Sequence, residues 1–331
     1  MRAMVTPEFG SPDLFEEQDV ERPEPGPGEI LVRVAASETN PIDAKFRAAG
    51  DSMGLEVPMI LGANVSGVVE EVDPGVDALA SGDELYYTPE VFGAGSNGGY
   101  AEYHLAPAYL VAKKPASVSH EEAAAVPLAG GTAHEALVGR LDVKVGETVL
   151  IDAGAGGVGS FAIQIAKAAG ARVLATAGPD NQETLTSLGA DVAIDYSSQD
   201  FVDVALEDTA EAGADAVLDA VGGDTVMNSI AATRPFGRLA TILGAQGGHH
   251  LGSAGGSHTD VSEESDPARC AAAPGTGAAR RADGPDRTRS DQATSGRSLT
   301  PERSRQGPRA ARLRARAGQD RAASGGGLRL K

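Results

Sequence analysis

A run of glycines between an apolar stretch and an alanine-rich segment most constrains how this chain folds. Within LIDAGAGGVGSFAIQIAKAAGARVLATAG (150–178), Gly154, Gly156 and Gly159 fit the pattern G-x-G-x-x-G, with Gly157 and Val158 inside it. The pattern follows a predicted strand and opens a predicted helix, as a dinucleotide-binding turn requires. The three glycines permit, in order, a tight turn, the approach of a pyrophosphate and close packing of the helix on the sheet. The sequence therefore predicts that these five residues bind a dinucleotide, whose phosphates the free N–H groups of the helix start would hold.

The patterns on either side of this turn predict two kinds of domain. Up to about residue 120, short strands broken by Gly and Pro, such as GEILVRVAASETN (28–40), predict a small β-rich domain. A helical segment at 119–139, with Ser119 as its N-cap, then leads into alternating strand and helix patterns that include a strand at 148–153 and a helix at 160–169. Repeated βα units indicate a parallel, doubly wound sheet. The predicted fold class is α/β, with domains at 1–120 and 121–246.

Residues 247–331 differ in composition from the rest of the chain. They contain no Ile, Phe, Tyr, Trp or Met and consist mostly of Arg, Ala, Gly, Ser and Pro. Such a segment buries too little apolar surface to offset the entropy of ordering its backbone, so we predict that it is disordered. Its arginine run lacks aromatic residues to stack on bases, and the histidines near Cys270 lie among flexible glycines. Neither a nucleic-acid site nor a metal site is therefore expected there.

The charge balance narrows the choice of partners. The chain has 28 Lys and Arg against 47 Asp and Glu, a net charge of −19, and the acidic excess lies in residues 1–246. This negative charge repels nucleic acid and anionic membranes, and it resembles the acidic surfaces of halophilic proteins. No stretch has the pattern of a secretory signal or a membrane span, and a single cysteine cannot form an internal disulfide framework. We therefore expect a cytoplasmic protein.

The end of the second predicted strand bears on the choice of dinucleotide. An NAD site usually places Asp or Glu there to hold the ribose 2′-hydroxyl. Here the strand ends ATAGPDNQE (175–183), with Thr176 at the expected place, Asn181 beyond it, and Asp180 late, after a proline. Because no carboxylate at the strand end repels a 2′-phosphate, NADPH is the predicted cofactor. No Lys or Arg follows nearby to hold that phosphate, so NADH stays open as the alternative.

The extended string GETVLIDAGAGGVGSFAIQIAKAAGARVLATA (146–177) resembles the nucleotide-binding signature of zinc-free quinone oxidoreductases in the medium-chain dehydrogenase/reductase superfamily. Other segments, among them ETNPIDAKFRAAG (38–50), GGYAEYHLAP (98–107) and LGADVAIDY (188–196), resemble that family in the same order, and the likeness spans about residues 1–246. It implies a GroES-like β domain followed by a Rossmann domain, with the active site in the cleft between them. It also implies NADPH-dependent hydride transfer to a small-molecule quinone or enone, and a homodimer if the C-terminal region is family-like.

The resemblance assigns candidate catalytic residues. It implies that Asn40 and Asp43, in NPID, line the cleft near the nicotinamide. Lys45 and Tyr100 are polar neighbours that would stabilise an enolate or donate a proton. Structural alternatives stay open: Asp43 as a helix cap, Lys45 as a solvated charge and Tyr100 as a core residue. Some relatives carry a tyrosine just after this region and FRAAGDSMG (46–54) has none, so the proton donor is not identified.

The resemblance also extends the candidate cofactor site beyond the glycine turn. Thr132, in GGTA, matches a family residue that contacts the cofactor phosphate or the nicotinamide. Tyr196 matches one that lies against the adenosine half. Gly222, Gly244 and Ala245 fall at later strand ends, where an open α/β sheet has its crevice.

The sequence predicts no metal. A catalytic zinc ion needs about three ligands from Cys, His, Asp or Glu. Zinc-dependent relatives have Gly-His-Glu where this chain has GAN (62–64), and Ala63 and Asn64 do not ligate zinc as those residues would. The four-cysteine lobe that holds a structural zinc is also missing. A zinc-type alcohol dehydrogenase is therefore the least favoured reading.

The resemblance stops at RLATILGAQG (238–247), although the chain has about the length of a full relative. The chain thus has the expected length, but its last part has a composition unlike that of the family. This combination suggests a shifted reading frame in GC-rich DNA, a hypothesis that translation of the other two frames would test. Two functions are therefore carried forward. One is an NADPH-dependent quinone or enone reductase that needs no metal. The other is a nucleotide-binding protein without turnover, either a truncated pseudoenzyme or a redox sensor.

Overall fold

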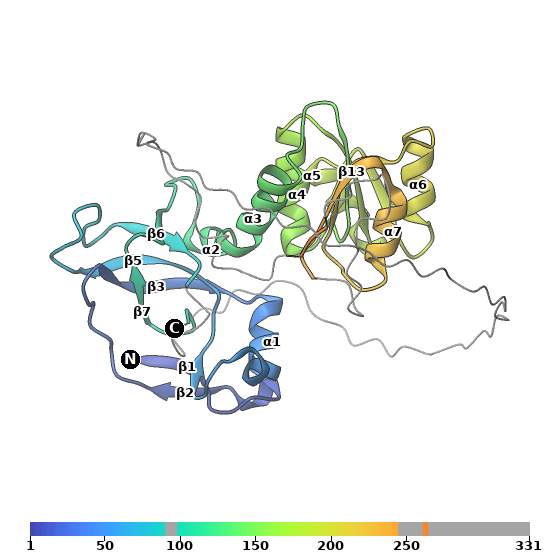
Figure 1. Ribbon diagram of the computed structural model, residues 1–331. Coiled ribbons are helices and arrows are strands. Elements are labelled where there is room, and N and C mark those ends of the chain that lie inside the picture. Colours follow the sequence, from blue (N-terminus) through green and yellow to red (C-terminus); the bar gives the residue numbers. More distant parts are fainter. Residues whose placement is uncertain (90–97, 244–260, 264–331) are drawn as a thin grey trace, which may run out of the picture. The chain divides into compact units, whose positions relative to one another are not determined.

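The computed structural model describes residues 1–89, 98–243 and 261–263. We call residues 1–118 the β-rich part and residues 119–243 with 261–263 the α/β part (Figure 1). Antiparallel sheets build the first and a parallel sheet with flanking helices builds the second. The predicted α/β fold class, a β-rich region followed by a doubly wound parallel sheet, is thereby confirmed.

The β-rich part has strands β1 (Arg2–Thr6), β2 (Glu16–Asp19), β3 (Glu29–Glu38), β4 (Met59–Ile60), β5 (Asn64–Val72), β6 (Glu84–Tyr87), β7 (Tyr103–Pro107) and β8 (Ala112–Lys113), and helix α1 (Pro41–Ala49). A five-stranded sheet runs in the order β7-β3-β5-β6-β8 and a three-stranded sheet in the order β2-β1-β4. Alternate residues of the central strands, including Ile30, Val32 and Val65, form the main apolar core. Helix α1 follows β3 after two residues and buries Phe46 in a second cluster.

The α/β part has helices α2 (His120–Ala124), α3 (Pro127–His134), α4 (Gly157–Ala168), α5 (Gln182–Leu188), α6 (Phe201–Asp208) and α7 (Thr225–Ala232). Its strands are β9 (Thr148–Ile151), β10 (Arg172–Ala177), β11 (Val192–Asp195), β12 (Ala214–Asp219), β13 (Thr233–Thr241) and β14 (Val261–Glu263), all parallel and in the order β11-β10-β9-β12-β13-β14. The chain order reverses between β9 and β12, and open α/β sheets bind ligands at such a point, beyond the carboxyl ends of the strands.

The two faces of this sheet have separate apolar cores, because successive side chains of a strand point to opposite faces. Val149 and Ile151 of β9 pack with α3, α4 and α5, whereas Leu150 packs with α6 and α7. Helix α4 contributes Gly159, Ala162, Ile163 and Ala166, the spacing of one buried helix face. The glycine turn therefore joins a strand that is buried from Val149 to Ile151 to a helix that packs on the sheet along one face.

The predicted element boundaries need three corrections. Strand β9 ends at Ile151, because Asp152 begins the turn and Ala153 takes a left-handed conformation with φ of 54°. Helix α4 begins at Gly157, inside the glycine pattern rather than after it. The predicted helix at 119–139 is divided into α2, α3 and a π-helical turn, with a break before Pro127, which has no N–H to donate.

The N-cap prediction for this region is confirmed. The Ser119 hydroxyl accepts a hydrogen bond from the Glu122 N–H at 3.1 Å, and the Glu122 carboxylate accepts one from the Ser119 N–H at 2.8 Å. This reciprocal pair gives an acceptor to each of two N–H groups at the start of α2 that have no partner within the helix.

Most of residues 247–331, together with Gly244 and Ala245, lie outside the described residues. The expectation of disorder is not met at Val261–Glu263, which form β14 and pair in parallel with β13, Leu239 beside Val261. The edge of β13 offers unpaired backbone groups, and these three residues occupy them. The expected dimer, which depends on the C-terminal region, stays a prediction.

Candidate functional site

The glycine turn lies at the carboxyl end of β9, where the sequence predicts a dinucleotide site. Two of its glycines are fixed by packing. A Cβ on Gly159 would lie 2.2 Å from the carbonyl oxygen of Ala153, and one on Gly154 would lie 2.8 Å from Leu185 and 2.9 Å from Ala175. The backbone of the glycine turn therefore touches the backbone of α4 at Gly159, and any side chain at Gly159 would push the two apart.

The other two glycines are less closely packed. A Cβ on Gly156 would lie 3.2 Å from the oxygen of Ala153, and one on Gly157 would meet nothing nearer than Ala129 at 3.7 Å. Both glycines are exposed, and α4 has no side chain capping its N-terminus at Gly156. The amides of Gly157, Val158 and Gly159 begin the helix, where N–H groups lack intrahelical partners and favour anions. The turn fits the pyrophosphate of a dinucleotide.

A buried polar network holds the turn from behind. The carboxylate of Asp152 accepts hydrogen bonds from the hydroxyls of Ser229 at 2.9 Å and Thr176 at 3.2 Å. The Thr176 hydroxyl in turn accepts one from the Ala153 N–H at 3.1 Å. The buried side chain of Thr176 thus holds the backbone of Ala153 in the turn, and its expected contact with the cofactor stays a prediction. Burial raises the pKa of Asp152 to about 6, and the neighbouring carboxylate of Asp219 adds to the rise.

Asp219 shapes the next strand end. It ends β12, is fully buried, and accepts hydrogen bonds from the N–H groups of Val221 at 2.8 Å and Gly222 at 3.0 Å. Gly222 has φ of 74°, which a glycine adopts without strain. Gly222, predicted as a cofactor residue, therefore lies in a tight loop at the carboxyl edge of β12, the strand that pairs with β9.

The ends of β10 and β11 bring two more predicted residues into place. Tyr196 follows β11 with its side chain 62% exposed, and its hydroxyl lies 3.3 Å from where a Cβ on Gly178 would be. Asn181 ends a short 3-10 turn (Pro179–Asn181) and is exposed. Tyr196 and Gly178 thus lie side by side at the carboxyl edge of the sheet, where the adenosine half was expected.

Thr132 makes only a local contact in the described structure. Its hydroxyl donates to the carbonyl of Leu128, one turn earlier in α3, at 2.7 Å. Its expected contact with a cofactor stays a prediction.

In the β-rich part, the segment predicted to contain catalytic residues forms a dense polar cluster. Asp43 is buried and accepts hydrogen bonds from the N–H groups of Asn40 at 2.7 Å and Gly62 at 3.0 Å. It therefore caps α1 and ties it to the segment between β4 and β5; the cap is the structural alternative considered for this residue. The Tyr100 hydroxyl donates to the carbonyl oxygen of Glu38 at 3.4 Å, beside the Asp43 carboxylate. Burial raises the pKa of Tyr100 well above its ordinary value, and Asp43 raises it further. Lys45 is exposed on α1.

Two residues of this cluster were missed from the sequence. Glu38, the last residue of β3, pairs across the sheet with Asn64, the first of β5. The Asn64 amide donates to Glu38 Oε2 at 2.7 Å, and the Asn40 amide reaches the same oxygen at 3.5 Å. Burial raises the pKa of Glu38, and the neighbouring Asp43 carboxylate adds to the rise. Only the strand register brings Glu38 and Asn64 together. The sequence therefore offered a single hint of this pair, a carboxylate two residues before Asn40 of NPID.

The residues at the expected zinc positions do not fit a zinc ion. Asn64 is fully buried, and besides donating to Glu38 its side-chain oxygen accepts from the Thr88 hydroxyl at 3.2 Å and the Leu128 N–H at 3.1 Å. Ala63 presents only a methyl group. Within residues 1–89 and 98–243, no group of three or more His, Cys, Asp or Glu side chains is placed to hold a metal. Cys270 lies outside the described residues.

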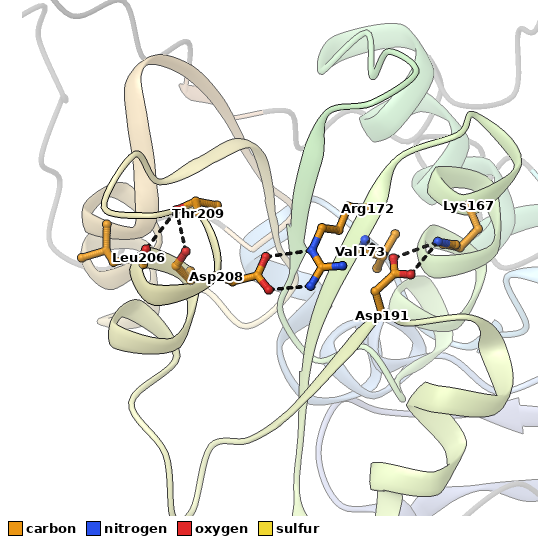
Figure 2. Close-up of polar contacts among 8 residues, drawn as sticks. Lys167, Arg172, Val173, Asp191, Leu206, Asp208 and Thr209 are labelled. Carbon is orange, nitrogen blue, oxygen red and sulfur yellow. Dashed lines mark hydrogen bonds and ion pairs between the residues drawn. The ribbon is translucent and has the colours of Figure 1, made fainter.

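A surface ion-pair network lies at the opposite, amino-terminal edge of the parallel sheet (Figure 2). Arg172, at the start of β10, makes two hydrogen bonds to Asp208 at 2.8 and 2.5 Å. Asp191 accepts from Lys167 at 2.8 Å and from the Val173 N–H at 2.7 Å. These pairs tie α4, β10 and the end of α6 together without approaching the glycine turn.

Two family models match the chain. The alcohol dehydrogenase GroES-like domain matches residues 26–116, and the zinc-binding dehydrogenase model matches residues 157–254. No helix in the described residues is both long and apolar enough to cross a membrane.

Several known proteins are similar over most of the chain. A quinone oxidoreductase from Lama guanicoe is 32% identical over 249 residues, which cover 75% of this chain and 74% of the relative. An NADPH-dependent alkenal/one oxidoreductase from Arabidopsis thaliana is 36% identical, covering 74% and 63% of the two chains. The solved quinone oxidoreductase of Pseudomonas syringae pv. tomato DC3000 superposes with a TM-score of 0.70 at 35% identity, covering 80% and 81%. A mycobacterial protein solved in complex with NADPH gives 0.70 at 35% identity, covering 80% and 82%.

The two antiparallel sheets, the parallel sheet, the glycine turn and these matches agree with the resemblance drawn from the sequence. The chain belongs to the medium-chain dehydrogenase/reductase superfamily and is an oxidoreductase of the quinone oxidoreductase-like group.

Proposed function

We propose that this protein transfers hydride from NADPH to a quinone or an α,β-unsaturated carbonyl compound, and that it needs no metal. The observation that carries the proposal is the open glycine turn at the start of α4, where exposed Gly156 and Gly157 leave room beside unpartnered amides. Relatives named for quinone and alkenal/one reduction, and a solved neighbour in complex with NADPH, support the substrate class and the cofactor.

In this proposal the α/β part binds and orients the dinucleotide. The amides of residues 157–159 hold the pyrophosphate, and Tyr196 lies beside Gly178 on the adenosine side. Strand β10 ends at Ala177 without a carboxylate, so no charge at the strand end opposes a 2′-phosphate. When bound, the nicotinamide supplies the hydride.

The β-rich part supplies neutral groups for the substrate oxygen. A metal-free site must stabilise the developing oxyanion with preorganised hydrogen-bond donors. The Asn40 amide fits this role, because its contact to Glu38 at 3.5 Å is long and the side chain is only half-buried. The Asp43 carboxylate accepts from the backbone of Asn40 and Gly62, and the Tyr100 hydroxyl donates to the carbonyl of Glu38, so they hold the cluster together and keep Asn40 in place.

The test uses the purified full-length chain. We expect NADPH absorbance to fall when a simple quinone or a simple enone is added, with NADH less effective and a metal chelator without effect. No oxidation of NADPH or NADH by either acceptor class would refute the reductase proposal. Loss of activity with chelator, restored by stoichiometric zinc, would refute the metal-free part alone.

A second function is favoured by one observation. The similarity to the Lama guanicoe relative covers 74% of that protein, and the zinc-binding dehydrogenase match ends at residue 254. A chain without the remaining family-like segment would bind the dinucleotide through an intact turn and fail to turn over. NADPH binding without oxidation in the presence of both acceptors would identify this case.

A further inference from the structure

Glu38 differs from every other carboxyl group of the polar cluster in the β-rich part. Asp43 is buried, and its two oxygens accept hydrogen bonds from the N–H groups of Asn40 and Gly62. Burial raises the pKa of Asp43, but each of its oxygens already accepts an N–H hydrogen bond, so neither is free to present a proton to a substrate. Tyr100 donates its hydroxyl proton to the carbonyl oxygen of Glu38 at 3.4 Å, and its raised pKa makes it a poor acid. The Glu38 side chain is half-buried and accepts hydrogen bonds only from amide side chains.

The two oxygens of Glu38 are distinguished by their surroundings. Oε2 accepts from the Asn64 amide at 2.7 Å and from the Asn40 amide at 3.5 Å. Across residues 1–89 and 98–243, no hydrogen-bond partner of Oε1 is found. In a protonated carboxyl group, the oxygen that accepts two N–H donors takes the carbonyl role, so the proton belongs on the other oxygen. Oε1 is therefore the oxygen that would carry and donate a proton.

The position of Glu38 is also fixed. Its backbone ends β3 in register with Asn64, and the Asn64 side chain is itself locked by the Thr88 hydroxyl and the Leu128 N–H. Asn40, two residues further along the chain, is the group that the proposed function places at the substrate oxygen. A fixed carboxyl group with one unpartnered oxygen thus lies beside the proposed oxyanion donor.

We propose that Glu38 is the proton donor that completes reduction of an enone. The proposal rests on the proposed function for the hydride and the substrate class. Hydride from the reduced dinucleotide forms a C–H bond at the β-carbon, the carbon–carbon double bond is reduced, and an enolate is left. The Oε1–H bond of Glu38 then breaks as a C–H bond forms at the α-carbon. The Glu38 carboxylate regains its proton from water, so the reaction consumes one enone, one reduced dinucleotide and one proton.

A quinone provides an internal comparison. Hydride transfer to a quinone gives a hydroquinone anion that is protonated on oxygen, and water exchanges protons with such an oxygen readily. Protonation of an enolate on carbon is slow, so a positioned acid raises its rate, typically by about 10²–10⁴-fold. Glu38 should therefore matter for enones and much less for quinones.

The test compares Glu38→Gln with Glu29→Gln, a matched control at the other end of β3. Glu29 is also half-buried and accepts one backbone N–H bond, from Gly26 at 2.9 Å. A glutamine at position 38 retains an oxygen that can accept from Asn64 but has no acidic proton. We expect Glu38→Gln to lower kcat for an enone at least about 100-fold and kcat for a quinone less than about fivefold. The Kd for NADPH and the urea midpoint should match those of Glu29→Gln.

Two further readouts separate a proton donor from a structural residue. Wild-type kcat for the enone should fall as pH rises and Glu38 loses its proton, and Glu38→Gln should lack that limb. On the free protein, infrared titration should show, beside the bands of other buried carboxyl groups such as Asp152, a protonated carboxyl band that persists above the ordinary glutamic acid range and is absent in Glu38→Gln. That band should be retained in Glu29→Gln and, at lower intensity at neutral pH, in Glu38→Asp.

The outcomes are distinct. Equal enone rates for Glu38→Gln and Glu29→Gln, or equal losses of Glu38→Gln on enone and quinone, would overturn the assignment of Glu38 while leaving the reductase proposal intact. No turnover by the wild type with either acceptor would overturn both.

Discussion

Replacing Gly159 by Ala tests whether backbone packing fixes the glycine turn. The new Cβ would lie 2.2 Å from the Ala153 oxygen and 2.7 Å from the Gly154 Cα. Carbon atoms pack at about 3.5–4.0 Å, so α4 and the turn would have to separate by about 1 Å. Both partners are backbone, and neither can rotate away. We expect a loss of about 1–3 kcal/mol in the free energy of unfolding, the usual cost of overpacking a closed site.

Gly157→Ala is the matched control, two residues earlier in the same helix. Its Cβ would meet only Ala129, at an ordinary contact distance of 3.7 Å. Because glycine costs about 0.5–1 kcal/mol relative to alanine within a helix, this variant should equal or slightly exceed the wild type in stability. Urea unfolding followed by circular dichroism measures both. A Gly159→Ala midpoint at or above that of Gly157→Ala would refute the packing argument.

Three other substitutions test separate features. The pKa of Asp152 is raised from 3.8 to about 6, so the folded state binds a proton more readily than the unfolded chain, and stability falls as pH rises from about 4 to about 6 and stays lower above it. Asp152→Asn should remove this dependence and raise the free energy of unfolding at neutral pH by about 1–3 kcal/mol, as urea titrations across that range would reveal. Phe236 is 63% exposed with φ of 61°, so Phe236→Gly should relieve left-handed strain and raise stability by about 1 kcal/mol; an unchanged or lower Tm would contradict this. Arg172→Ala removes an exposed pair with Asp208 at the far edge of the sheet (Figure 2), so it should cost less than about 1 kcal/mol and leave NADPH affinity unchanged, which calorimetry checks.

The parts of the fold that depend on local pattern could be predicted from the sequence. The strand, glycine turn and helix at 148–168 lie in one short segment, so both the site and its orientation follow from residue order. The Ser119 cap involves residues three apart. The exact helix start could not be predicted, because the glycines of the pattern permit both turn and helix and only their packing against Ala153 decides between them.

The networks behind the site could not be predicted, because they join distant segments. Asp152 accepts from Ser229, 77 residues later, and their contact depends on β9 and β12 being neighbours in the sheet. Glu38 meets Asn64 only through the register of β3 on β5. Thr176 was assigned to the cofactor from its place at a strand end, and the direction of its side chain, toward Asp152, is set by the strand's alternation.

Calorimetric titration with NADPH of the wild type and of Gly156→Ala tests the central claim most directly. Gly156 has φ of −78° and ψ of 174°, which alanine adopts freely. The added Cβ would lie 3.2 Å from the Ala153 carbonyl oxygen, a close contact that a shift of a few tenths of an ångström relieves, so the fold should persist. That Cβ would occupy the path of the pyrophosphate. The account predicts binding by the wild type and at least about tenfold weaker binding by Gly156→Ala at an unchanged urea midpoint. It is contradicted if the folded wild type takes up neither NADPH nor NADH, or if Gly156→Ala binds as tightly as the wild type.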